Sequence, residues 1–438
     1  MAESKSKRKK LSRKNNKVGF DRISDLPECL LIHILSFLPT QKAMATSVLS
    51  TRWKHLWTLV PKLDIPRGTT LDPTDVLSRI LSFVVQPLLR DGLTTLRKLE
   101  ELDLDIYNGD DSWSWLKAGL DFNKDNESLK LPHRVFYCKT LVVLKLHGKI
   151  RIDVPSSSSF QFPSLMELGL FHLVYKSDSL FRLLSACHVL EDLTFEREYR
   201  DGVFDYKICI PILKRLSVDF EVGEYIGYEL IPYDDYKLEM KTPALEYFKF
   251  NGHLREVVFL QKLDNLLQAD VNICTFEEKD HRQEEQCYAD RVFKILAALY
   301  NVKFLSFYSG HSECLSNGST YPSPVRLEFK VNAWNWHVLQ ALLQNSPNLE
   351  VLDVTKMVSL LNVMDIDGSE YEMEFLKYIL KEARGLKTTT ISAGNIKLKE
   401  SVLKELSMIP RRSITCLLKI ERKLSEVLSC DKNCFLTL

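Results

Sequence analysis

A six-residue leucine pattern, L-x-x-L-x-L, recurs along this chain and constrains its fold more than any other feature. Most copies stand 21 to 25 residues apart, with longer steps of 42, 32, 36 and 37 residues where insertions fall. Leucine makes up 70 of the 438 residues, so some matches arise by chance, but the recurrent spacing and the Pro or Ser just upstream of several copies favour a genuine repeat. The five clear copies and the six looser ones begin at Leu99, Leu141, Leu165, Leu190 and Leu213, and at Leu245, Leu266, Val302, Pro324, Leu349 and Leu386.

Each copy has the spacing of a short strand, because alternation in its last three positions points two leucines to one face. A single copy cannot close a core of its own, so neighbouring copies must stack. A period of about 20 to 29 residues is typical of leucine-rich repeats. The sequence therefore predicts an α/β fold, a curved leucine-rich-repeat solenoid over residues 99–355, with helices such as 177–189 and 335–344 between strands. A compact α/β domain is the alternative.

The strand residues that point away from the leucines form the concave face of the predicted solenoid. In the five clear copies this face carries seven acids against two bases, hence a net charge of −5. A groove of one charge sign focuses the electric field. We therefore expect it to bind a basic or hydroxyl-rich target surface, the alternative being an ordinary solvated sheet face. The candidate target-binding residues are Glu101, Asp103, Asp105, Lys145, His147, Glu167, Phe171, Asp192, Glu196, Arg215 and Asp219.

Residues 20–62 space their apolar side chains in a different, helical way. A helix that opens near Pro27 carries one broad apolar stripe from Leu30 to Leu38. Thr40 is placed to cap a second helix, and a third short helix follows. Three helices within about forty residues cannot bury all of this apolar surface among themselves. Part of it should therefore meet a partner protein or the rest of the chain.

This segment resembles the F-box. The matching pieces are Leu26-Pro27, the Leu30 to Leu38 stripe, Val48-Leu49-Ser50, Arg52-Trp53 and Trp57. The resemblance implies that the apolar helix faces dock onto the Skp-type adaptor of a cullin-RING ubiquitin ligase. Some of the same side chains could equally form the small core of the segment. Carried over by position, the candidate adaptor-binding residues are Leu26, Pro27, Leu31, Ile34, Leu35, Leu49 and Trp53.

The C-terminal residues 368–438 resemble the FBD segment found in many plant F-box/leucine-rich-repeat proteins. The matching pieces are Glu374-Phe375, Tyr378-Ile379-Leu380, Ala383 before Leu386-Lys387, and Pro410-Arg411-Arg412-Ser413 with Cys416. The Trp- and Pro-containing stretch usual just upstream is replaced here by KMVSLLNVMDI. The pattern predicts helices near 375–380 and 400–408 and a strand over 414–418. We expect the segment to cap the open end of the solenoid.

The near-neutral total charge of +1 hides a basic N-terminus. Residues 1–17 hold eight basic side chains against the single acid Glu3, a net charge of +7. Like charges in a row cannot pack, so the sequence predicts a basic disordered tail over residues 1–18. Such a tail can also be a nuclear-import address or a phosphate-binding arm. We therefore expect the protein in the nucleus, the cytoplasm or both, with nucleic acid as the weaker alternative partner.

Several classes of function find no support in the sequence. A secretory signal and a run of 18 apolar residues are absent, so no membrane partner is expected. The ten cysteines are scattered without a framework, which indicates reduced thiols. The chain contains no G-x-S-x-G, G-x-x-x-x-G-K-[ST], G-x-G-x-x-G, H-E-x-x-H or C-x-x-C motif. We expect no catalytic residue, no bound metal and no cofactor.

The sequence thus predicts a non-catalytic substrate-recognition subunit of a Skp-cullin-F-box ubiquitin ligase. The F-box would bind the Skp-type adaptor and through it a cullin, and the repeats would hold an unknown target protein. A nuclear nucleic-acid-associated factor and a non-degradative F-box scaffold are the alternatives. The expected segments are a basic tail over 1–18, an F-box over 19–65, a helical connector over 66–98, leucine-rich repeats over 99–355 and an FBD-like segment over 368–438.

Overall fold

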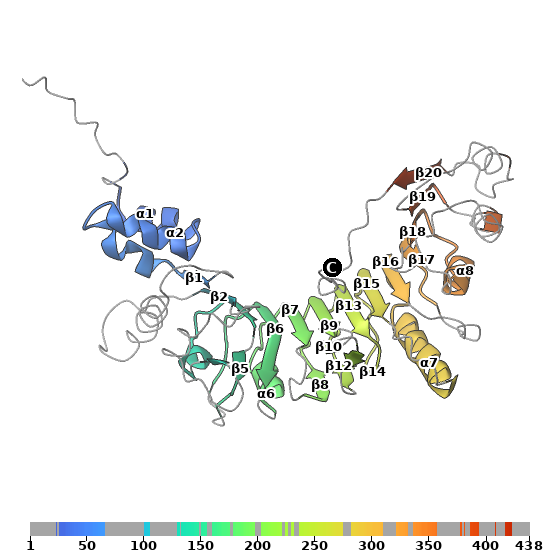
Figure 1. Ribbon diagram of the computed structural model, residues 1–438, viewed down its shortest axis with the longest axis horizontal. Coiled ribbons are helices and arrows are strands. Elements are labelled where there is room, and N and C mark those ends of the chain that lie inside the picture. The colour runs from blue at the N-terminus through green and yellow to red at the C-terminus, as the bar shows by residue number, and fades with distance from the viewer. Residues whose placement is uncertain are drawn as a thin grey trace, which may run out of the picture. The chain divides into compact units, whose positions relative to one another are not determined.

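The chain divides into two compact units, residues 1–62 and residues 63–438, which we describe separately. The structure is a computed structural model (Figure 1). The predicted tail 1–18 and connector 66–98 lie outside the described residues. The residues described are 23, 26–65, 100–105, 129–131, 133–148, 150–155, 160–175, 178–197, 203–220, 224–226, 229–231, 236–274, 282–309, 321–331, 336–356, 377–378, 381, 386–393, 408 and 417–422.

The N-terminal unit consists of short helices. Two are α-helices, α1 (Glu28–Ser36) and α2 (Thr40–Ala45), and two are 3₁₀ helices, η1 (Thr46–Val48) and η2 (Trp53–Leu59). Pro27 is the N-cap of α1, as its fixed φ favours, so the predicted opening of the first helix is confirmed.

One detail of the second helix differs from the prediction. Thr40 is the first residue of α2 rather than its cap, and its side chain makes no capping hydrogen bond. Pro39 occupies the N-cap position, and its carbonyl accepts from the N–H groups of Lys42 at 2.8 Å and Ala43 at 3.0 Å. The reason is that proline has no N–H to leave unsatisfied and its φ already suits helix entry.

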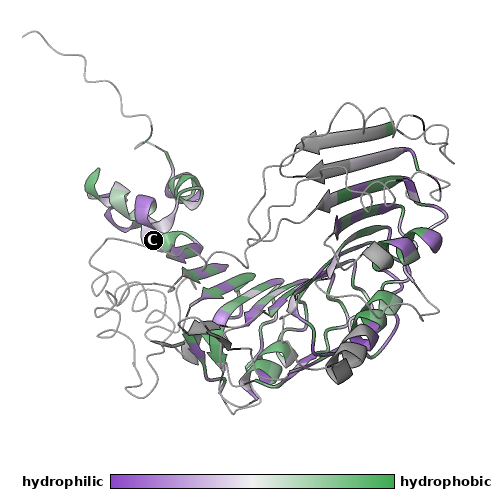
Figure 2. Ribbon diagram, turned by 45° about the vertical axis from the view of Figure 1, so that its right-hand side comes forward, coloured by the Kyte–Doolittle hydropathy of each residue, from purple (hydrophilic) through white to green (hydrophobic). Residues whose placement is uncertain are grey.

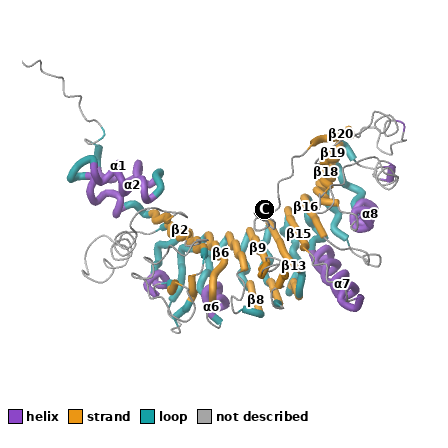
Figure 3. Tube along the Cα trace, in the orientation of Figure 1, coloured by secondary structure: helices purple, strands orange, loops and turns teal. Residues whose placement is uncertain are grey.

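The second unit is built on a largely parallel sheet (Figures 1 and 3). Its main path runs β1-β2-β4-β6-β7-β9-β13-β15-β16-β17-β18-β19-β20, with β3 and β5 attached beside β6. The strands of this sheet are β1 (Lys62–Ile65), β2 (Glu101–Asp105), β3 (Leu129–Lys130), β4 (Val143–His147), β5 (Ile150–Ile152), β6 (Glu167–Tyr175), β7 (Asp192–Arg197), β9 (Arg215–Phe220), β13 (Tyr247–His253), β15 (Gln268–Cys274), β16 (Phe304–Ser309), β17 (Arg326–Val331), β18 (Val351–Lys356), β19 (Thr388–Ala393) and β20 (Leu417–Arg422).

Every predicted leucine anchor precedes a strand of this sheet. Each strand from β2 to β19 on the main path begins two residues after its anchor, as β4 does after Leu141 and β16 after Val302. The parallel registers place the anchored positions opposite each other, for example Leu102 with Leu144 and Leu144 with Leu168. The inward positions are buried, and hydropathy alternates along the strands (Figure 2). The prediction of a stacked repeat of parallel strands is confirmed.

A backbone ladder joins successive strands at the point where each begins. The carbonyl of Val142 accepts from the N–H groups of Met166 at 2.8 Å and Glu167 at 3.1 Å. This pairing of one carbonyl with two N–H groups is repeated from β2 to β19. The other carbonyls that accept in this way belong to Glu100, Met166, Glu191, Lys214, Glu246, Leu267, Lys303, Val325 and Glu350.

A second layer covers the leucine face of the sheet. It contains a three-stranded parallel sheet in the order β14-β12-β8 and helices between the main strands. The helix α6 (Ser179–Ser185) forms within the predicted range 177–189 and buries Leu180, Leu183 and Leu184. The remaining elements are η4 (His133–Tyr137), α6 (Ser179–Ser185), β8 (Asp205–Ile208), the antiparallel pair β10 (Glu224–Ile226) and β11 (Glu229–Ile231), β12 (Lys237–Met240), β14 (Glu256–Phe259), α7 (Arg282–Ala298) and α8 (Trp336–Gln344).

Aromatic side chains fill the space between the two layers. Tyr206 on β8 meets Phe195 and Phe220 of the main sheet, each with ring centroids 5.2 Å apart. Tyr236 stacks on Phe220 at 4.1 Å, and the guanidinium of buried Arg197 lies 5.7 Å from the rings of both tyrosines. A cation over an aromatic face is stabilised by the ring quadrupole, which allows a charge to remain in this core.

The predicted FBD-like segment contributes strands to the same sheet. β19 pairs in parallel with β18, and β20 pairs in parallel with β19. β20 begins at Leu417 and overlaps the strand predicted at 414–418 at residues 417 and 418, while residues 414–416 lie outside the described residues. Most of the helices predicted at 375–380 and 400–408 lie outside the described residues.

Gly252 provides a test of this packing. Its φ is 127°, and a Cβ atom at this position would lie 1.8 Å from the carbonyl oxygen of Phe220 on the neighbouring strand. We expect Gly252→Ala to lower the free energy of unfolding of the second unit by about 2–4 kcal/mol, from backbone strain and overpacking. Guanidinium denaturation followed by far-UV circular dichroism measures the change. Gly169→Ala is the control, because its Cβ would press on the side chains of Phe171 and Lys145 and not on the backbone. An equal loss in both variants would contradict the argument.

Candidate protein-binding surfaces

The N-terminal unit has a small core of its own. Leu31 and Leu35 of α1, Ala43 of α2, and Trp53 and Leu56 of η2 are buried against one another. Their spacing explains the fold, because residues i and i+4 of a helix lie on one face. This cluster holds the three elements α1, α2 and η2 together.

A hydrogen bond from a side chain to a backbone carbonyl joins the starts of two helices in this unit. The guanidinium of Arg52 donates to the carbonyl of Leu26, which lies two residues before α1. Arg52 and Trp53 thus act in different ways: one ties the start of η2 to the start of α1, and the other fills the core. The adjacent Arg-Trp pair of the sequence motif is therefore explained by structure alone.

A second set of apolar side chains in this unit is exposed to solvent. Ile34 is 43% exposed, Leu49 64%, Phe37 74% and Val48 85%. Monomeric proteins rarely leave so many large apolar groups on so small a unit unless a partner covers them. We call the following residues the exposed apolar set: Leu30, Ile34, Phe37, Leu38, Val48 and Leu49.

The seven predicted adaptor-binding residues divide between the core and the surface. Leu31, Leu35 and Trp53 lie in the core, where they support the unit from within. Ile34 and Leu49 belong to the exposed apolar set, Pro27 is exposed and Leu26 is half-buried. Contact of these residues with an adaptor stays a prediction.

Four members of the exposed apolar set are absent from the predicted adaptor-binding residues, namely Leu30, Phe37, Leu38 and Val48. The sequence feature that could have indicated an exposed apolar face is the width of the apolar stripe on α1, which exceeds what one buried face needs. Leu31 and Leu35 already supply one buried face, so the apolar residues beside them, Leu30 and Ile34, must belong to a second face. Phe37 is the C-cap of α1 and Val48 is the last residue of the three-residue η1, so helical periodicity does not assign a face to either.

The second candidate surface is the solvent-facing side of the main sheet, which we call the polar face. The parallel register brings the predicted target-binding residues into rows across the strands. One row runs through Asp105, His147, Phe171, Glu196 and Asp219. A second row contains Glu167, Asp192 and Arg215, with Glu101 at its start, and Asp103 lies opposite Lys145.

Many charges on the polar face are paired with a neighbouring strand. Lys145 lies 2.7 Å from Glu167, and Arg215 pairs with Asp192. The imidazole of His147 lies 3.5 Å from Asp103 and stacks on the ring of Phe171 at 4.0 Å. These pairs join β2 to β4, β4 to β6 and β7 to β9, and they leave an excess of carboxylates.

The excess of acid is confined to the first half of the polar face. Asn251 donates from its amide nitrogen to both carboxylate oxygens of Asp219, at 2.9 and 2.8 Å, at the boundary between the halves. On the outward positions of β13 to β18, three bases and three acids balance. These are Lys249, Arg326 and Lys330 against Asp270, Glu328 and Asp353.

A local irregularity shapes this face beside β7. His172 has a φ of 56° at a β-bulge between Phe171 and Leu173. The bulge lets β6 continue past the main register and pair with β5, and it brings the His172 imidazole 3.3 Å from Glu196.

Three protein-family models match parts of this chain. The F-box domain matches residues 23–64, the leucine-rich repeats of the FBD-associated F-box protein At5g56370 match residues 95–239, and the FBD matches residues 357–391. The FBD-associated F-box protein At5g60610 of Arabidopsis thaliana is 30% identical over 85% of this chain and 100% of its own length. The putative FBD-associated F-box protein At3g50710 of the same plant is 28% identical over 92% and 100%.

This chain belongs to the plant F-box/FBD/LRR-repeat family.

The family matches fit the two units. The F-box match ends at residue 64, close to the end of the first compact unit at Lys62, and the predicted limit was 65. The repeat match covers β2 to β12, while the observed strands continue to residue 356 and beyond. The FBD match begins at 357, eleven residues before the boundary predicted at 368.

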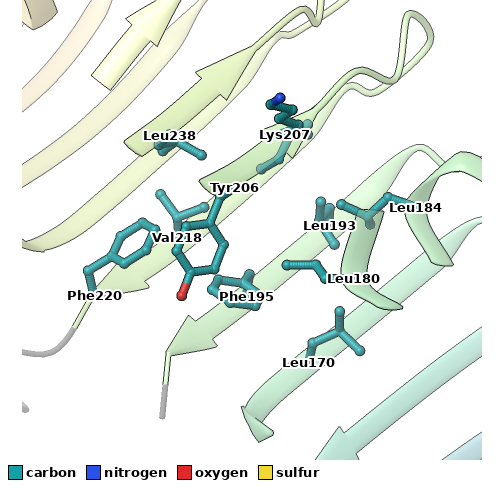
Figure 4. A pocket seen from close by; sticks show the side chains of 11 residues that line it. Leu170, Leu180, Leu184, Leu193, Phe195, Tyr206, Lys207, Val218, Phe220 and Leu238 are labelled. Carbon is teal, nitrogen blue, oxygen red and sulfur yellow. The ribbon is translucent and has the colours of Figure 1, made fainter. Parts of the chain in front are cut away.

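F-box/FBD/LRR-repeat proteins are typically non-catalytic adaptors. The described residues of this chain contain no cluster of His, Cys, Asp and Glu that could hold a metal ion. Their helices include none long and apolar enough to cross a membrane. A space between α6, β8 and the main sheet measures only about 10 Å³ and is lined mainly by leucine and aromatic side chains (Figure 4). It is at the lower limit for one water molecule, so it is a packing gap.

The reactivity of the Cys187 thiol tests how tightly the core around it is packed. Burial raises its pKa to about 12, so almost none of it is thiolate at pH 8. We expect iodoacetamide at pH 8 to modify the exposed Cys29 and Cys209 in the folded protein and to leave Cys187 unmodified. Peptide mass spectrometry measures this, with guanidinium-unfolded protein as the control in which all three react. Modification of Cys187 as fast as Cys209 would contradict the packing described.

Proposed function

We propose that this protein is the substrate-recognition subunit of a Skp-cullin-F-box ubiquitin ligase. An F-box implies binding to a Skp-type adaptor, and the domain composition is that of an F-box substrate adaptor. The observation that carries the proposal is the exposed apolar set on a unit that already has a complete core. These side chains have no use in the fold of the N-terminal unit, and an adaptor groove would remove them from water.

The expected contact uses two faces of α1 for two purposes. The face with Leu31 and Leu35 holds the unit together, and the face with Leu30 and Ile34 meets the adaptor. Covering a side chain as large as leucine contributes about 1.5–3 kcal/mol. Six such residues are enough to drive association after the entropic cost of binding.

We propose further that the parallel strands form a leucine-rich-repeat solenoid whose polar face holds the target. Support comes from the repeated register and from the rows of polar side chains that it aligns. The acid excess over β2 to β9 suits a basic target segment. The existing pairs, such as Lys145 with Glu167, would keep the carboxylates in place before the target arrives.

The mechanism is proximity. The repeats would raise the concentration of the target beside the ubiquitin-transfer machinery, and the adaptor would link the subunit to a cullin. The protein itself would contribute no catalytic residue and no cofactor. We place this activity in the nucleus, the cytoplasm or both. The alternative function is that of a scaffold, which would bind the adaptor and a partner protein without causing degradation of that partner.

Adaptor binding is tested by surface variants that leave the core intact. We expect Ile34→Asp combined with Leu49→Asp to lower adaptor capture at least about tenfold, because two charges would have to be desolvated. Co-purification with a co-expressed Skp-type adaptor measures capture. The matched control is Met166→Asp combined with Phe204→Asp, which are exposed apolar residues of the second unit. Full capture by the first variant, or none by the wild-type chain, would contradict the proposal.

Target binding is tested on the polar face. We expect Asp103→Lys, Glu167→Lys and Asp192→Lys together to abolish capture of basic target proteins and to leave adaptor capture unchanged. Target partners trapped by the chain without residues 23–64 are compared by quantitative mass spectrometry, and adaptor capture is measured separately with the full chain. Unchanged partners would remove the acidic face from the proposal. Partners lost instead on deletion of residues 1–17, with steep salt dependence, would favour the nucleic-acid alternative.

A further inference from the structure

The two edges of the second-layer sheet are covered in different ways. This three-stranded sheet runs β14-β12-β8, so β8 and β14 are its edge strands. A helix lies beside each edge, α6 next to β8 and α7 next to β14. The two edges differ in the volume that is left open between the helix and the strand beside it.

At the β8 edge the helix closes the sheet. Leu180 and Leu184 of α6 pack toward Tyr206 and Ile208 of β8, and the gap that remains is about 10 Å³ (Figure 4). Large branched side chains on the helix are the reason for the closure.

At the β14 edge the helix leaves a groove of about 1060 Å³. The wall formed by α7 consists of residues 290, 291, 294, 297 and 298, which is the i, i+1, i+4, i+7, i+8 spacing of one helix face. Two of these, Ala297 and Ala298, are too small to fill the space. The small side chains of Ala297 and Ala298 contribute to the open space on this wall. A pocket of about 300–1,000 Å³ holds a drug-sized ligand, so this groove is large enough for several peptide residues.

The floor of the groove includes an open strand edge. The N–H groups of Glu256 and Leu260 donate to β12, to the carbonyls of Tyr236 and Met240. Alternate residues of a strand direct their backbone groups to opposite neighbours. Val257 and Phe259 therefore point their N–H and C=O groups toward the groove. A row of unpaired backbone groups of this kind is a template for another strand.

The charges in the groove favour an acidic partner. Lys262, after β14, and Lys294, on α7, are exposed and form no ion pair with a described residue. Glu256 is 3.5 Å from Lys237, but that lysine lies closer to Glu239, at 2.9 Å, so Glu256 counts among the acids of the groove. Glu256 and Asp290 are the two acids that oppose Lys262, Lys294 and Arg291. The groove therefore presents a net positive charge of one unit beside a strand edge.

We propose that the groove between β14 and α7 binds an extended acidic peptide segment of a partner protein, which adds as a fourth strand to the β14-β12-β8 sheet. The backbone edge of Val257 and Phe259 provides the hydrogen bonds, and Lys262 and Lys294 select carboxylate side chains. The site lies within the second unit and on a different sheet from the polar face. It does not depend on adaptor binding or on the target surface proposed above.

The probe is a fluorescein-labelled, end-capped octapeptide of alternating valine and glutamate, titrated into the full chain and followed by fluorescence anisotropy. We expect saturable binding below about 1 mM, at least tenfold stronger than that of the analogue with lysine in place of glutamate. Two further analogues carry N-methyl groups on all the valines or on all the glutamates. Because alternate amides of a strand face opposite sides, we expect one analogue to lose binding and the other to keep it.

Two protein variants locate the site. We expect Lys262→Glu with Lys294→Glu to weaken binding of the acidic peptide by about tenfold or more. The matched control is Lys207→Glu with Lys249→Glu, which reverses two exposed lysines outside the groove and should leave binding within about twofold. Ala297→Leu with Ala298→Leu should close the groove and abolish binding. Circular dichroism and thermal unfolding check folding, and if the leucine variant does not fold, the lysine variant carries the test.

Four results would overturn the proposal. They are no binding of the acidic peptide at about 1 mM, equal binding of the lysine analogue, equal binding of both methylated analogues, and unchanged binding by the Lys262/Lys294 variant. Light scattering adds a fifth: dimerisation of the chain that the groove variants abolish would assign the edge to a second copy instead. Adaptor co-purification is measured in parallel, so failure here is separate from failure of the proposed function.

Discussion

The sheet of the second unit depends on one repeated backbone interaction, the carbonyl before each strand that accepts from two N–H groups of the next copy. Because both partners are main-chain groups, the contact does not need a particular side chain. This explains why inward rows tolerate Ala269 and Thr389 among leucines and phenylalanines. Register is therefore fixed by the backbone ladder and by burial together, and the rows of the polar face follow from it.

The leucine spacing was sufficient to predict the strands β2 to β19 of the main path, because the last two leucine positions of the pattern are the buried positions of its strand. It could not predict β8, β12 and β14, whose four-residue sequences DYKI, KLEM and EVVF carry no anchor. These strands form only because tertiary contacts on the far side of the core select them. The long helix α7 likewise carries no leucine anchor, and its first described residue, Arg282, lies in the charged run 277–285.

The N-terminal unit shows a different limit of sequence reasoning. A helix that is apolar on two faces gives one wide stripe, and periodicity cannot say which side is the core. The structure separates the two faces, with Leu35 buried and Ile34 exposed on adjacent residues. Only the positions of α2 and η2 decide between them, since Ala43 and Trp53 complete one face and leave the other uncovered.

Insertions between the leucine copies have a further consequence. β4 begins 42 residues after β2, whereas β15 begins 21 residues after β13, yet each starts two residues after its anchor. The position of each strand in the sheet is therefore set by its leucine anchor and not by the length of the connector before it. Connectors can lengthen or shorten without moving a polar side chain from its row, so a chain of this kind can gain or lose a groove such as that beside β14 while the order of the strand-facing surface is kept.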